Sequence, residues 1–475
     1  MNNKQPTALS YIPLNYEPTL AYSLFEPIEA LPWAMLLCSS SNEHVDSRFD
    51  ILVANPLATV TTKGTDTTTS VYRFEQDSPF ERTLEEKVTH QGDPFTTIES
   101  VMDEQLAEID TSKYVLPQDC PFVGGILGYF SYDLGRHVET LPNLAKHDID
   151  NQDMAVGLYE TAVIIDHQDK AAYCIGLYPK EFMLWLHNQK KKPQLNFGLT
   201  SDWTSNMSKQ EYSQRFDQVQ EYLLSGDCYQ INLAQRFNVS YQGSEWDAFN
   251  RLNEQNKAPF SAFIRTEESS IISISPERFL LLDKHEIETK PIKGTRPRFS
   301  DPALDENSAN ELKAAEKDQA ENLMIVDLLR NDIGRVAKPG TVHVPKLFDI
   351  ESFPAVHHLV STIRAKLDDE YNATDLLRAC FPGGSITGAP KVRAMQIIEE
   401  LEPHRRSTYC GSIGYISRCG RMDTSITIRT LVAHNNQLFA WAGGGVVADS
   451  QCDAEYQETF DKLSRILPIL EKKES

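Results

Sequence analysis

Residues 412–447 read SIGYISRCGRMDTSITIRTLVAHNNQLFAWAGGGVV, and this stretch decides the fold class. Apolar and β-branched residues dominate three segments, 412–417, 422–433 and 438–447, which predicts three strands. Turn-forming residues such as Asn435-Asn436 separate the segments and are typical of connections between antiparallel neighbours. We therefore expect an antiparallel meander near the end of the chain.

Strands and helices are mixed along the preceding sequence. Residues 271–275 and 279–282 are apolar runs that predict two further strands. Residues 307–336 are rich in Ala, Glu, Leu and Lys and predict one long helix, and a last helix is expected from Ser450 towards Leu470. This mixture favours an α+β protein with helices packed on its sheets, and argues against a doubly wound nucleotide-binding fold.

The chain has 475 residues, which is long enough for more than one domain. A polar segment, 188–204, interrupts the pattern, and a new helix is predicted after it. Ser208 and Glu211 have the spacing of a capping box that starts a helix. We divide the chain here into residues 1–204 and residues 205–475.

Charge excludes several classes of partner. The 46 Lys and Arg residues against 68 Asp and Glu residues leave a net charge of −22, which argues against binding to nucleic acid or anionic lipid. No run of about 18 apolar residues and no signal-peptide pattern occurs, so we expect a cytoplasmic protein without a membrane anchor. The eight cysteines form no C-x-x-C motif and are expected to be reduced thiols.

Two pairs of acids lie at helical spacing and could hold a metal ion. Asp318 and Glu321 share one face of a predicted helix, and Glu455 and Glu458 share a face of the last helix. Each pair alone is typical of a solvated helix surface. If the two faces meet, the carboxylates repel each other unless a cation joins them, and an all-oxygen ligand set favours Mg²⁺.

A basic segment stands out within the acidic chain. Four cations and only Glu288 lie within residues 287–298, a local charge of +4 − 1 = +3, which suggests an anion site. Glycine-rich segments at 294–295, 382–391 and 443–445 could bring backbone N–H groups close to a carboxylate or phosphate. None has the pattern of a P-loop or a dinucleotide-binding turn, so we expect neither an ATP nor an NAD site.

Taken together, these motifs resemble the chorismate-utilising enzymes. The segments that carry this resemblance are PIKGT (291–295), AENLMIVDLLRND (320–332), HHLVS (357–361), PGGSITGAPK (382–391), IRT (428–430) and AGGGVVADS (442–450). A closer resemblance, to the members that aminate chorismate, covers almost the whole chain. It adds LPWAMLL (31–37), SRFD (47–50), GG (124–125), YDLGR (132–136) and SGDCYQINLAQRF (225–237).

The resemblance implies a fold and a reaction. The fold would be a large composite of mostly antiparallel sheets packed together with helices outside, in which residues 1–204 are intertwined with a catalytic domain, residues 205–475. The reaction would convert chorismate and ammonia to 4-amino-4-deoxychorismate for 4-aminobenzoate and folate biosynthesis. Lys293 would add to C2 of chorismate and Glu277 would protonate the departing C4 hydroxyl. The alternatives are a Lys293 that only pairs with a substrate carboxylate, and a Glu277 that pairs with Arg278.

Ligand contacts are also implied by the resemblance. Glu321 and Glu458 would bind Mg²⁺, with Asp318 and Glu455 in neighbouring, water-mediated places. Residues expected to bind the substrate are Gly294, Thr295, His358, Tyr415, Arg429 and Gly445. A separate glutamine amidotransferase subunit would supply ammonia in a heterodimer. A tryptophan pocket in the first half would be formed by Ser39, Asp46, Ser47, Arg48, Phe49, Pro259, Phe260 and Ser261.

The proposed nucleophile must be a free amine to react. Burial, or the nearby cations Lys290 and Arg296, should therefore lower the pKa of Lys293.

Three other functions remain open at this point. Anthranilate synthases usually have Ala in place of Lys293, and isochorismate or salicylate synthases use a lysine to activate water. The chain could also be a catalytically silent subunit that binds chorismate or tryptophan, although it retains Lys293, Glu277, Glu321 and Glu458 together.

Overall fold

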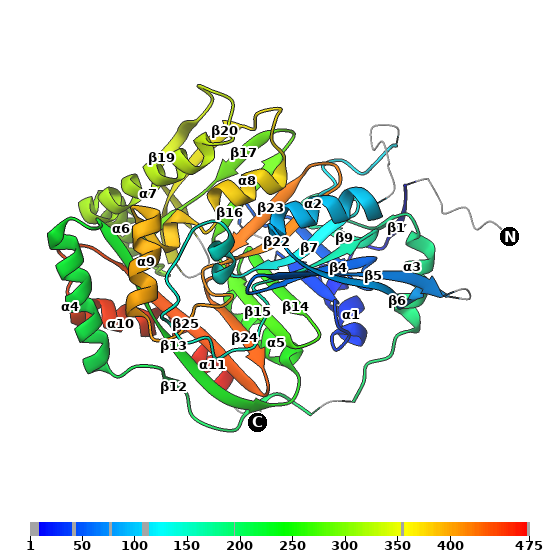
Figure 1. Ribbon diagram of the computed structural model, residues 1–475, viewed down its shortest axis with the longest axis horizontal. Coiled ribbons are helices and arrows are strands. Elements are labelled where there is room, and N and C mark those ends of the chain that lie inside the picture. The colour runs from blue at the N-terminus through cyan, green and yellow to red at the C-terminus, as the bar shows by residue number, and fades with distance from the viewer. Residues whose placement is uncertain are drawn as a thin grey trace.

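The computed structural model describes residues 9–39, 44–75, 78–106, 114–193, 195–352 and 356–472. Within them, the strands form two sheets of 13 and 12 strands, and the pairings between named strands are antiparallel. Helices lie on the outside of the sheets (Figure 1). These features confirm the predicted α+β class. None of the described helices is both long and apolar enough to cross a bilayer.

The first sheet takes strands from both ends of the chain. In spatial order it contains β1 (Ser10–Leu14), β10 (Ala171–Gly176), β9 (Thr161–Asp166), β3 (Phe49–Val53), β2 (Met35–Cys38), β14 (Phe260–Arg265), β15 (Ser269–Ser275), β24 (Thr430–His434), β25 (Gln437–Val446), β13 (Gln230–Gln242) and β11 (Gly198–Leu199). Two short strands, β12 (Thr204–Ser205) and β21 (Gly388–Ala389), also pair with β13.

The second sheet also takes strands from distant parts of the chain. Its order is β18 (Ile292–Pro297), β20 (Val356–Lys366), β17 (Glu286–Thr289), β16 (Arg278–Asp283), β23 (Met422–Ile426), β22 (Ser412–Ser417), β7 (Gly125–Phe130), β8 (Met154–Tyr159), β4 (Ala58–Lys63), β5 (Asp66–Glu75) and β6 (Ser78–Gln91), and β19 (His343–Ser352) pairs with β20. Both sheets therefore combine strands from before and after residue 204. A division of the chain at that residue does not separate one sheet from the other.

Helices connect and cover the sheets. They are α1 (Leu20–Phe25), α2 (Pro94–Gln105), α3 (Pro179–Asn188), α4 (Lys209–Ser225), α5 (Glu245–Asn256), α6 (Pro302–Ala314), α7 (Glu316–Gly334), α8 (Ala373–Cys380), α9 (Lys391–Leu401), α10 (Cys452–Leu463) and α11 (Leu467–Glu471), with short 3₁₀ turns η1 (Glu26–Ile28), η3 (Tyr132–His137) and η4 (Gly384–Ile386). The capping box predicted at Ser208 and Glu211 starts α4: the Glu211 N–H donates to Ser208 Oγ, and the Ser208 N–H donates to Glu211 Oε2.

The two faces of the first sheet bury different apolar clusters. Along β2 and β3, Met35 and Ile51 belong to the larger cluster, which also includes the strands of the second sheet. Their neighbours Leu36 and Leu52 belong to a second cluster with α1, α3 and α5. This alternation follows from the two-residue period of a strand and explains why apolar runs, and not alternating ones, mark the central strands.

The predicted meander is wrong in one respect. Residues 422–433 form two strands, not one: β23 pairs with β22 in the second sheet, whereas β24 pairs with β15 and β25 in the first. The chain passes between the sheets at residues 427–429, and Arg429 has a left-handed φ of 51°. Apolar and β-branched residues continue on both sides of the break, so the sequence pattern gives no signal of it.

Two predicted helices are also divided. The helix expected over 307–336 is α6 and α7, which meet at Ala315 in an extended conformation (ψ 98°). The last helix is α10 followed by α11. Ala315 is suited to a helix, so tertiary packing decides the break: α6 packs Leu312 against Gly294, and α7 turns its acids towards the same strand.

Candidate active site

Lys293 lies on β18 beside a bulge that Gly294 makes possible. The pairing of β18 with β20 shifts register between Lys293 and Thr295, and Gly294 has a φ of 74°. A Cβ atom at Gly294 would lie 2.9 Å from Cγ of Asp318 on α7. A glycine here therefore permits both the bulge, which changes the direction of the flanking side chains, and the close approach of α7.

The side-chain nitrogen of Lys293 is surrounded by buried groups. Nζ donates a hydrogen bond to the carbonyl oxygen of Ser385 at 3.2 Å. Burial lowers the pKa of Lys293, the acids Glu321 and Glu277 oppose that shift, and the cation Lys462 reinforces it. The predicted effect of burial is confirmed, but the reinforcing cation is not one of the two that the basic segment suggested.

Lys290 and Arg296, the two expected cations, are neutralised by acids of their own. Lys290 binds Asp46 and Glu351, with Nζ 3.0 and 3.1 Å from their nearest oxygens. Arg296 binds Asp318 at 3.2 Å. Neither cation is among the main causes of the lowered pKa of Lys293.

Glu277 is a buried carboxyl next to this lysine. It lies between β15 and β16, has 5% of its surface exposed, and accepts a hydrogen bond of 2.9 Å from Ser385 Oγ. Burial raises the pKa of Glu277, although the hydrogen bond from Ser385 and the charge of Lys293 act in the opposite direction. Arg278, the expected alternative partner, instead binds Asp423 and Asp46.

Three further predicted residues, Arg429, His358 and Thr295, lie near this pair. Burial lowers the pKa of the Arg429 guanidinium, and Glu277 is the acid that acts against this shift. Burial and the charge of Arg429 lower the pKa of His358 to about 3, so its imidazole is neutral at pH 7. Nδ1 of His358 and Oγ1 of Thr295 share a hydrogen bond of 2.9 Å. Lys293, Glu277, Arg429, His358 and Thr295 are thus brought together.

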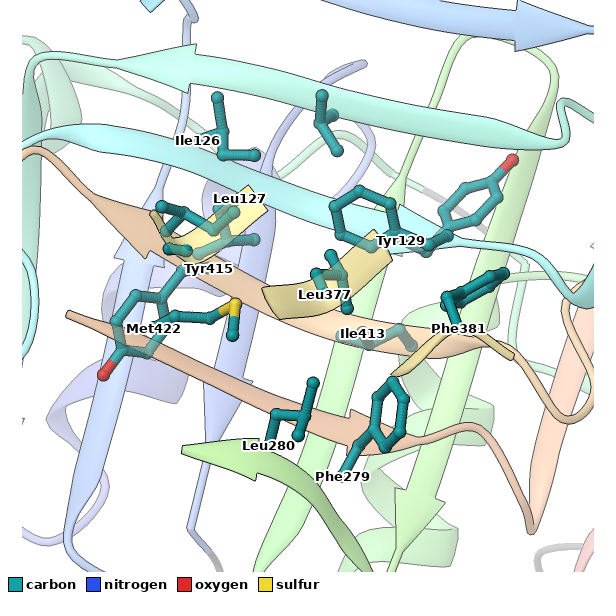
Figure 2. Packing of buried hydrophobic residues seen from close by; sticks show 14 of the residues in the cluster. Ile126, Leu127, Tyr129, Phe279, Leu280, Leu377, Phe381, Ile413, Tyr415 and Met422 are labelled. Carbon is teal, nitrogen blue, oxygen red and sulfur yellow. The ribbon is translucent and has the colours of Figure 1, made fainter. Parts of the chain in front are cut away.

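Tyr415 does not join this group. Its ring belongs to the larger apolar cluster and contacts Phe122 edge to face, with centroids 5.8 Å apart. Figure 2 shows it between Leu127 and Met422 on the packed strands of the second sheet. Burial raises the pKa of Tyr415, and its charged neighbours are Arg421 and Asp423. The crossing of the chain between the two sheets separates Tyr415 from Arg429.

Gly445 lies on β25 in the first sheet, within a run of three glycines. A Cβ atom at Gly445 would lie 2.5 Å from Nε2 of Gln230, and one at Gly444 would lie 2.7 Å from Oε2 of Glu455. The run therefore lets β13 and α10 approach β25 closely. Gln230 is fully buried, and neither polar atom of its amide has a hydrogen-bond partner among the described residues.

The four predicted metal ligands come from two helices: α7, which packs against β18, and α10, which packs against β25. Burial and the charges of Asp318 and Glu455 keep the pKa of Glu321 raised despite Lys293 and Lys317 nearby. Burial also raises the pKa of Glu455, whose Oε1 accepts from Ser450 at 2.7 Å while Oε2 is buried without a partner among the described residues.

Cations of the protein already lie among these acids. Burial would raise the pKa of Glu458, but Lys462, with Nζ 2.7 Å from Oε1, lowers it overall. Lys317 lies 4.0 Å from Glu321. No three of the four predicted ligands, all within the described residues, place an oxygen each within 4.8 Å of one another. The mutual repulsion of these carboxylates nevertheless fits a divalent cation bound by oxygen, as does the buried Oε2 of Glu455, which has no partner among the described residues.

A tighter cluster of potential ligands lies elsewhere. His44, Asp46 and Glu351 each place one ligand atom within 4.8 Å of the others. The Lys290 ammonium binds both carboxylates of this cluster, and Arg278 binds Asp46 as well. Cationic side chains thus provide the charge that a metal ion would otherwise bring.

The residues predicted for a tryptophan pocket meet only in part. Ser39 Oγ donates to the carbonyl oxygens of Phe49 and Pro259, at 3.1 and 3.3 Å, and so joins three segments. Phe260 and Ser261 follow on β14, and Phe260 lies under Arg278.

The other members of this set have contacts elsewhere. Asp46 belongs to the Lys290 network, and Arg48 forms ion pairs with Asp119, Asp166 and Asp169. Ser47 Oγ is buried without a partner among the described residues.

Sequence reasoning missed three residues of the site: Ser385, Lys462 and Gln230. Ser385 lies within the glycine-rich segment 382–391, which was expected to contribute backbone N–H groups and not a side chain. Lys462 stands four residues after Glu458, a common surface spacing on helices. Gln230 carries no local signal, because its burial depends on the neighbouring strands.

Known proteins resemble this chain along most of its length. The family model of chorismate binding enzymes matches residues 42–468. Aminodeoxychorismate synthase component 1 of Escherichia coli (strain K12) is 55% identical over 97% of this chain and 98% of its own length.

Solved structures agree with that match. Anthranilate synthase component I from Streptococcus pneumoniae TIGR4 has a TM-score of 0.74 and 28% identity, covering 89% of this chain and 93% of that one. The menaquinone-specific isochorismate synthase from Escherichia coli has a TM-score of 0.72 at 15% identity, covering 98% of this chain and 94% of that one, and shows the fold alone.

Proposed function

This chain belongs to the chorismate-binding enzymes, and we propose that it acts as an aminodeoxychorismate synthase component 1. It would convert chorismate and ammonia to 4-amino-4-deoxychorismate for 4-aminobenzoate and folate biosynthesis. The identity of 55% over nearly the full length of the Escherichia coli relative supports this choice within the family.

The observation that carries the proposal is the meeting of Lys293 and Glu277 at Ser385. Burial lowers the pKa of Lys293 and raises the pKa of Glu277, so both groups are shifted towards their uncharged forms. A free amine is a nucleophile, and a protonated carboxyl is a general acid. An anthranilate synthase would need no nucleophilic lysine at this place.

These two groups divide the reaction between them. Lys293 Nζ adds to C2 of chorismate, the ring double bond shifts, and the C4 oxygen leaves with a proton from Glu277 as water. The lysine nitrogen is positively charged in the adduct, and the Glu277 carboxylate is left ionised. Ammonia then adds at C4, the double bond returns, and the lysine is expelled from C2 as the neutral amine. The new ammonium group at C4 returns one proton to Glu277. The sum is chorismate plus ammonia to 4-amino-4-deoxychorismate plus water.

Substrate binding falls to the cationic and neutral groups around the lysine. None of the ion pairs between described residues includes the Arg429 guanidinium, so its N–H donors are available to a substrate carboxylate. The neutral His358 imidazole and the Thr295 hydroxyl orient the substrate through hydrogen bonds. Gly294 and Gly445 contribute backbone groups where a side chain would not fit.

Magnesium completes the proposed site. Glu321 and Glu458 would bind it, with Asp318 and Glu455 in neighbouring places. When bound, the ion would neutralise a carboxylate of the dianionic substrate and the repulsion among these acids. Lys462 and Lys317 would then release the carboxylates that they now contact.

Two partners belong to the proposal. A separate glutaminase subunit supplies ammonia in a heterodimer, as the name component 1 of the Escherichia coli relative suggests. Tryptophan binds beside Ser39, Pro259 and Phe260, where the three segments meet. Denaturation should release tryptophan from the purified protein, or calorimetry should detect its binding; if neither does, this part is wrong.

The main test is an assay of the purified chain with chorismate, ammonium and Mg²⁺, with products separated by chromatography. We expect 4-amino-4-deoxychorismate. Anthranilate or isochorismate as the only product would refute the proposal, and no product together with chorismate binding would favour a silent subunit.

The lysine is tested separately with Lys293→Ala. We expect amination to fall at least a thousandfold while chorismate still binds, because only a step of the reaction is lost. Mass spectrometry of wild-type enzyme quenched during turnover should detect an adduct on Lys293. The control is Lys313→Ala, an exposed lysine on α6, which should keep full activity. Undiminished turnover of Lys293→Ala would show that the lysine only binds.

A further inference from the structure

We propose that Ser385 is a positioning residue that holds the acid and the nucleophile in one fixed arrangement. Its hydroxyl donates to Oε1 of Glu277 at 2.9 Å, and its carbonyl oxygen accepts from Nζ of Lys293 at 3.2 Å. One residue thus contacts both groups that the proposed function assigns to chemistry, on which this inference rests. Ser385 itself has 7% of its surface exposed.

The turn that carries Ser385 is anchored on both sides. Before it, Gly383 accepts a hydrogen bond of 3.1 Å from Thr387 Oγ1, and a Cβ atom at Gly384 would lie 2.7 Å from Leu328 of α7. After it, the carbonyl oxygen of Thr387 accepts from the N–H of Asn232 on β13 at 2.8 Å. The turn is therefore fixed to the first sheet and to α7.

A buried ion pair holds the next residue of the turn. Arg406 donates to the carbonyl oxygen of Ile386 at 3.0 Å and has 1% of its surface exposed. Its guanidinium also binds both carboxylate oxygens of Glu402, at 2.9 and 2.6 Å. A buried arginine with this many fixed donors is a rigid support, so Ser385 has little freedom to move relative to the sheets.

Each contact of Ser385 restricts one catalytic group. A Ser385 hydroxyl that donates to Glu277 Oε1 fixes the orientation of the carboxyl. An N–H of Lys293 that donates to the carbonyl oxygen directs the lone pair of the free amine away from Ser385. Since the acid and the nucleophile must act on different carbons of one ring, their separation has to be fixed before the substrate binds.

Three variants test this role. Ser385→Ala removes the hydroxyl but keeps the carbonyl oxygen, Ser385→Cys replaces it with a weak donor of similar size, and Ser385→Thr restores it. We expect kcat to fall at least tenfold in the first two, with the KM for chorismate within twofold of wild type. Ser385→Thr should recover kcat to within about threefold of wild type.

The pH dependence of kcat provides a second readout. A hydroxyl that donates to Glu277 favours the ionised carboxyl, so its loss lets burial raise the pKa of Glu277 further. We expect the pH profile of Ser385→Ala to be displaced to higher pH on the side that Glu277 controls. The matched control is Ser412→Ala on β22, a buried serine whose Oγ donates to the Ser425 carbonyl oxygen at 2.9 Å. It should retain the wild-type profile.

The outcomes separate this inference from the proposed function. Wild-type enzyme that makes no 4-amino-4-deoxychorismate in the same assay refutes the function. Active wild type with unchanged kcat in folded Ser385→Ala, or a Ser385→Thr variant as impaired as Ser385→Ala, refutes the role of Ser385 alone. If Ser385→Ala does not fold, as judged by circular dichroism, wild-type kcat in Ser385→Cys overturns the inference and a reduced kcat with wild-type KM supports it.

Discussion

Lys290 donates hydrogen bonds to both carboxylate oxygens of Asp46, at 3.2 and 3.0 Å, although 244 residues separate them along the chain. The pair joins the segment before β3 to the residues that lead into β18 and Lys293. Arg278 and Glu351 extend the network, so that Asp46 forms ion pairs with two cationic side chains and Lys290 with two carboxylates. The first half of the chain is thereby connected directly to the segment that leads into β18.

Asp46→Asn should destabilise the protein by about 2–4 kcal/mol at pH 7. The substitution removes one acidic partner from each of two largely buried cations, Arg278 and Lys290. Chemical denaturation measures this change. Burial raises the pKa of Asp46, but Arg278 and Lys290 lower it overall, so the contribution of Asp46 is present above its unfolded pKa of about 3.9 and is lost as pH falls below it. The difference between variant and wild type should narrow below about pH 4.

A surface pair provides the control for that experiment. Asp150 pairs with Lys63 and has 72% of its side chain exposed, so Asp150→Asn should cost less than about 1 kcal/mol. Equal effects of the two substitutions would contradict a structural role for the buried network.

Gly294→Ala should destabilise the protein and abolish amination. The substitution combines a left-handed φ of 74° with a Cβ atom 2.9 Å from Cγ of Asp318. Gly420→Ala separates the two effects, since Gly420 has a φ of 83° and no described atom within 4 Å of the position that a Cβ would take. We expect chemical denaturation to show that Gly420→Ala lowers the free energy of unfolding by about 1 kcal/mol, and that Gly294→Ala lowers it by at least twice as much. Similar values would show that α7 can move away from the strand at little cost.

Magnesium should raise the melting temperature of the chain without substrate, because it relieves repulsion among Asp318, Glu321, Glu455 and Glu458. Glu321→Gln and Glu458→Gln should each reduce that rise by more than half, as measured by differential scanning fluorimetry over a range of Mg²⁺ concentrations. Glu316→Gln, an acid in the first turn of the same helix as Glu321, is the matched control and should preserve the full rise. A full rise in Glu321→Gln and Glu458→Gln would place the ion elsewhere.

Asp133 should make stability depend on pH. Burial and the nearby Asp153 raise the pKa of Asp133 to about 6, compared with about 3.9 when unfolded. The folded state therefore holds this proton more tightly, and stability contributed by Asp133 falls as pH rises from about 4 to 6 and stays low above that. The stability of Asp133→Asn relative to wild type should increase by about 3 kcal/mol between pH 4 and pH 7.5.

The comparison for Asp133 uses denaturation at both pH values. Asp103→Asn, at an exposed position on α2, should differ from wild type by less than about 0.5 kcal/mol at either pH. A pH-independent effect of Asp133→Asn would mean that the carboxyl is charged throughout this range.

The main chemical groups of the candidate site could be predicted from the sequence, but the full set of its residues could not. Lys293, Glu277, Arg429 and His358 lie in short motifs whose residue types identify the reaction, and the structure brings them together. The resemblance predicted Tyr415 as a further substrate contact, and a single strand over 422–433 would have placed it near Arg429. Ser385, Lys462 and Gln230 were missed because each reaches the site through a segment distant in sequence: Ser385 and Lys462 act on Lys293, and Gln230 lies against Gly445.

The sequence by itself determined the fold class and the family and predicted which residues react, because apolar periodicity, helix caps and short motifs are local properties of the chain. Only the tertiary structure decided which sheet each strand joins, and therefore which residues share the site. The segment around Arg429 satisfies strand propensity equally in either sheet. The chain passes from the second sheet to the first because β23 and β24 are each buried against strands far away in sequence. This passage places Arg429 beside Glu277, whereas Tyr415 lies in the apolar core.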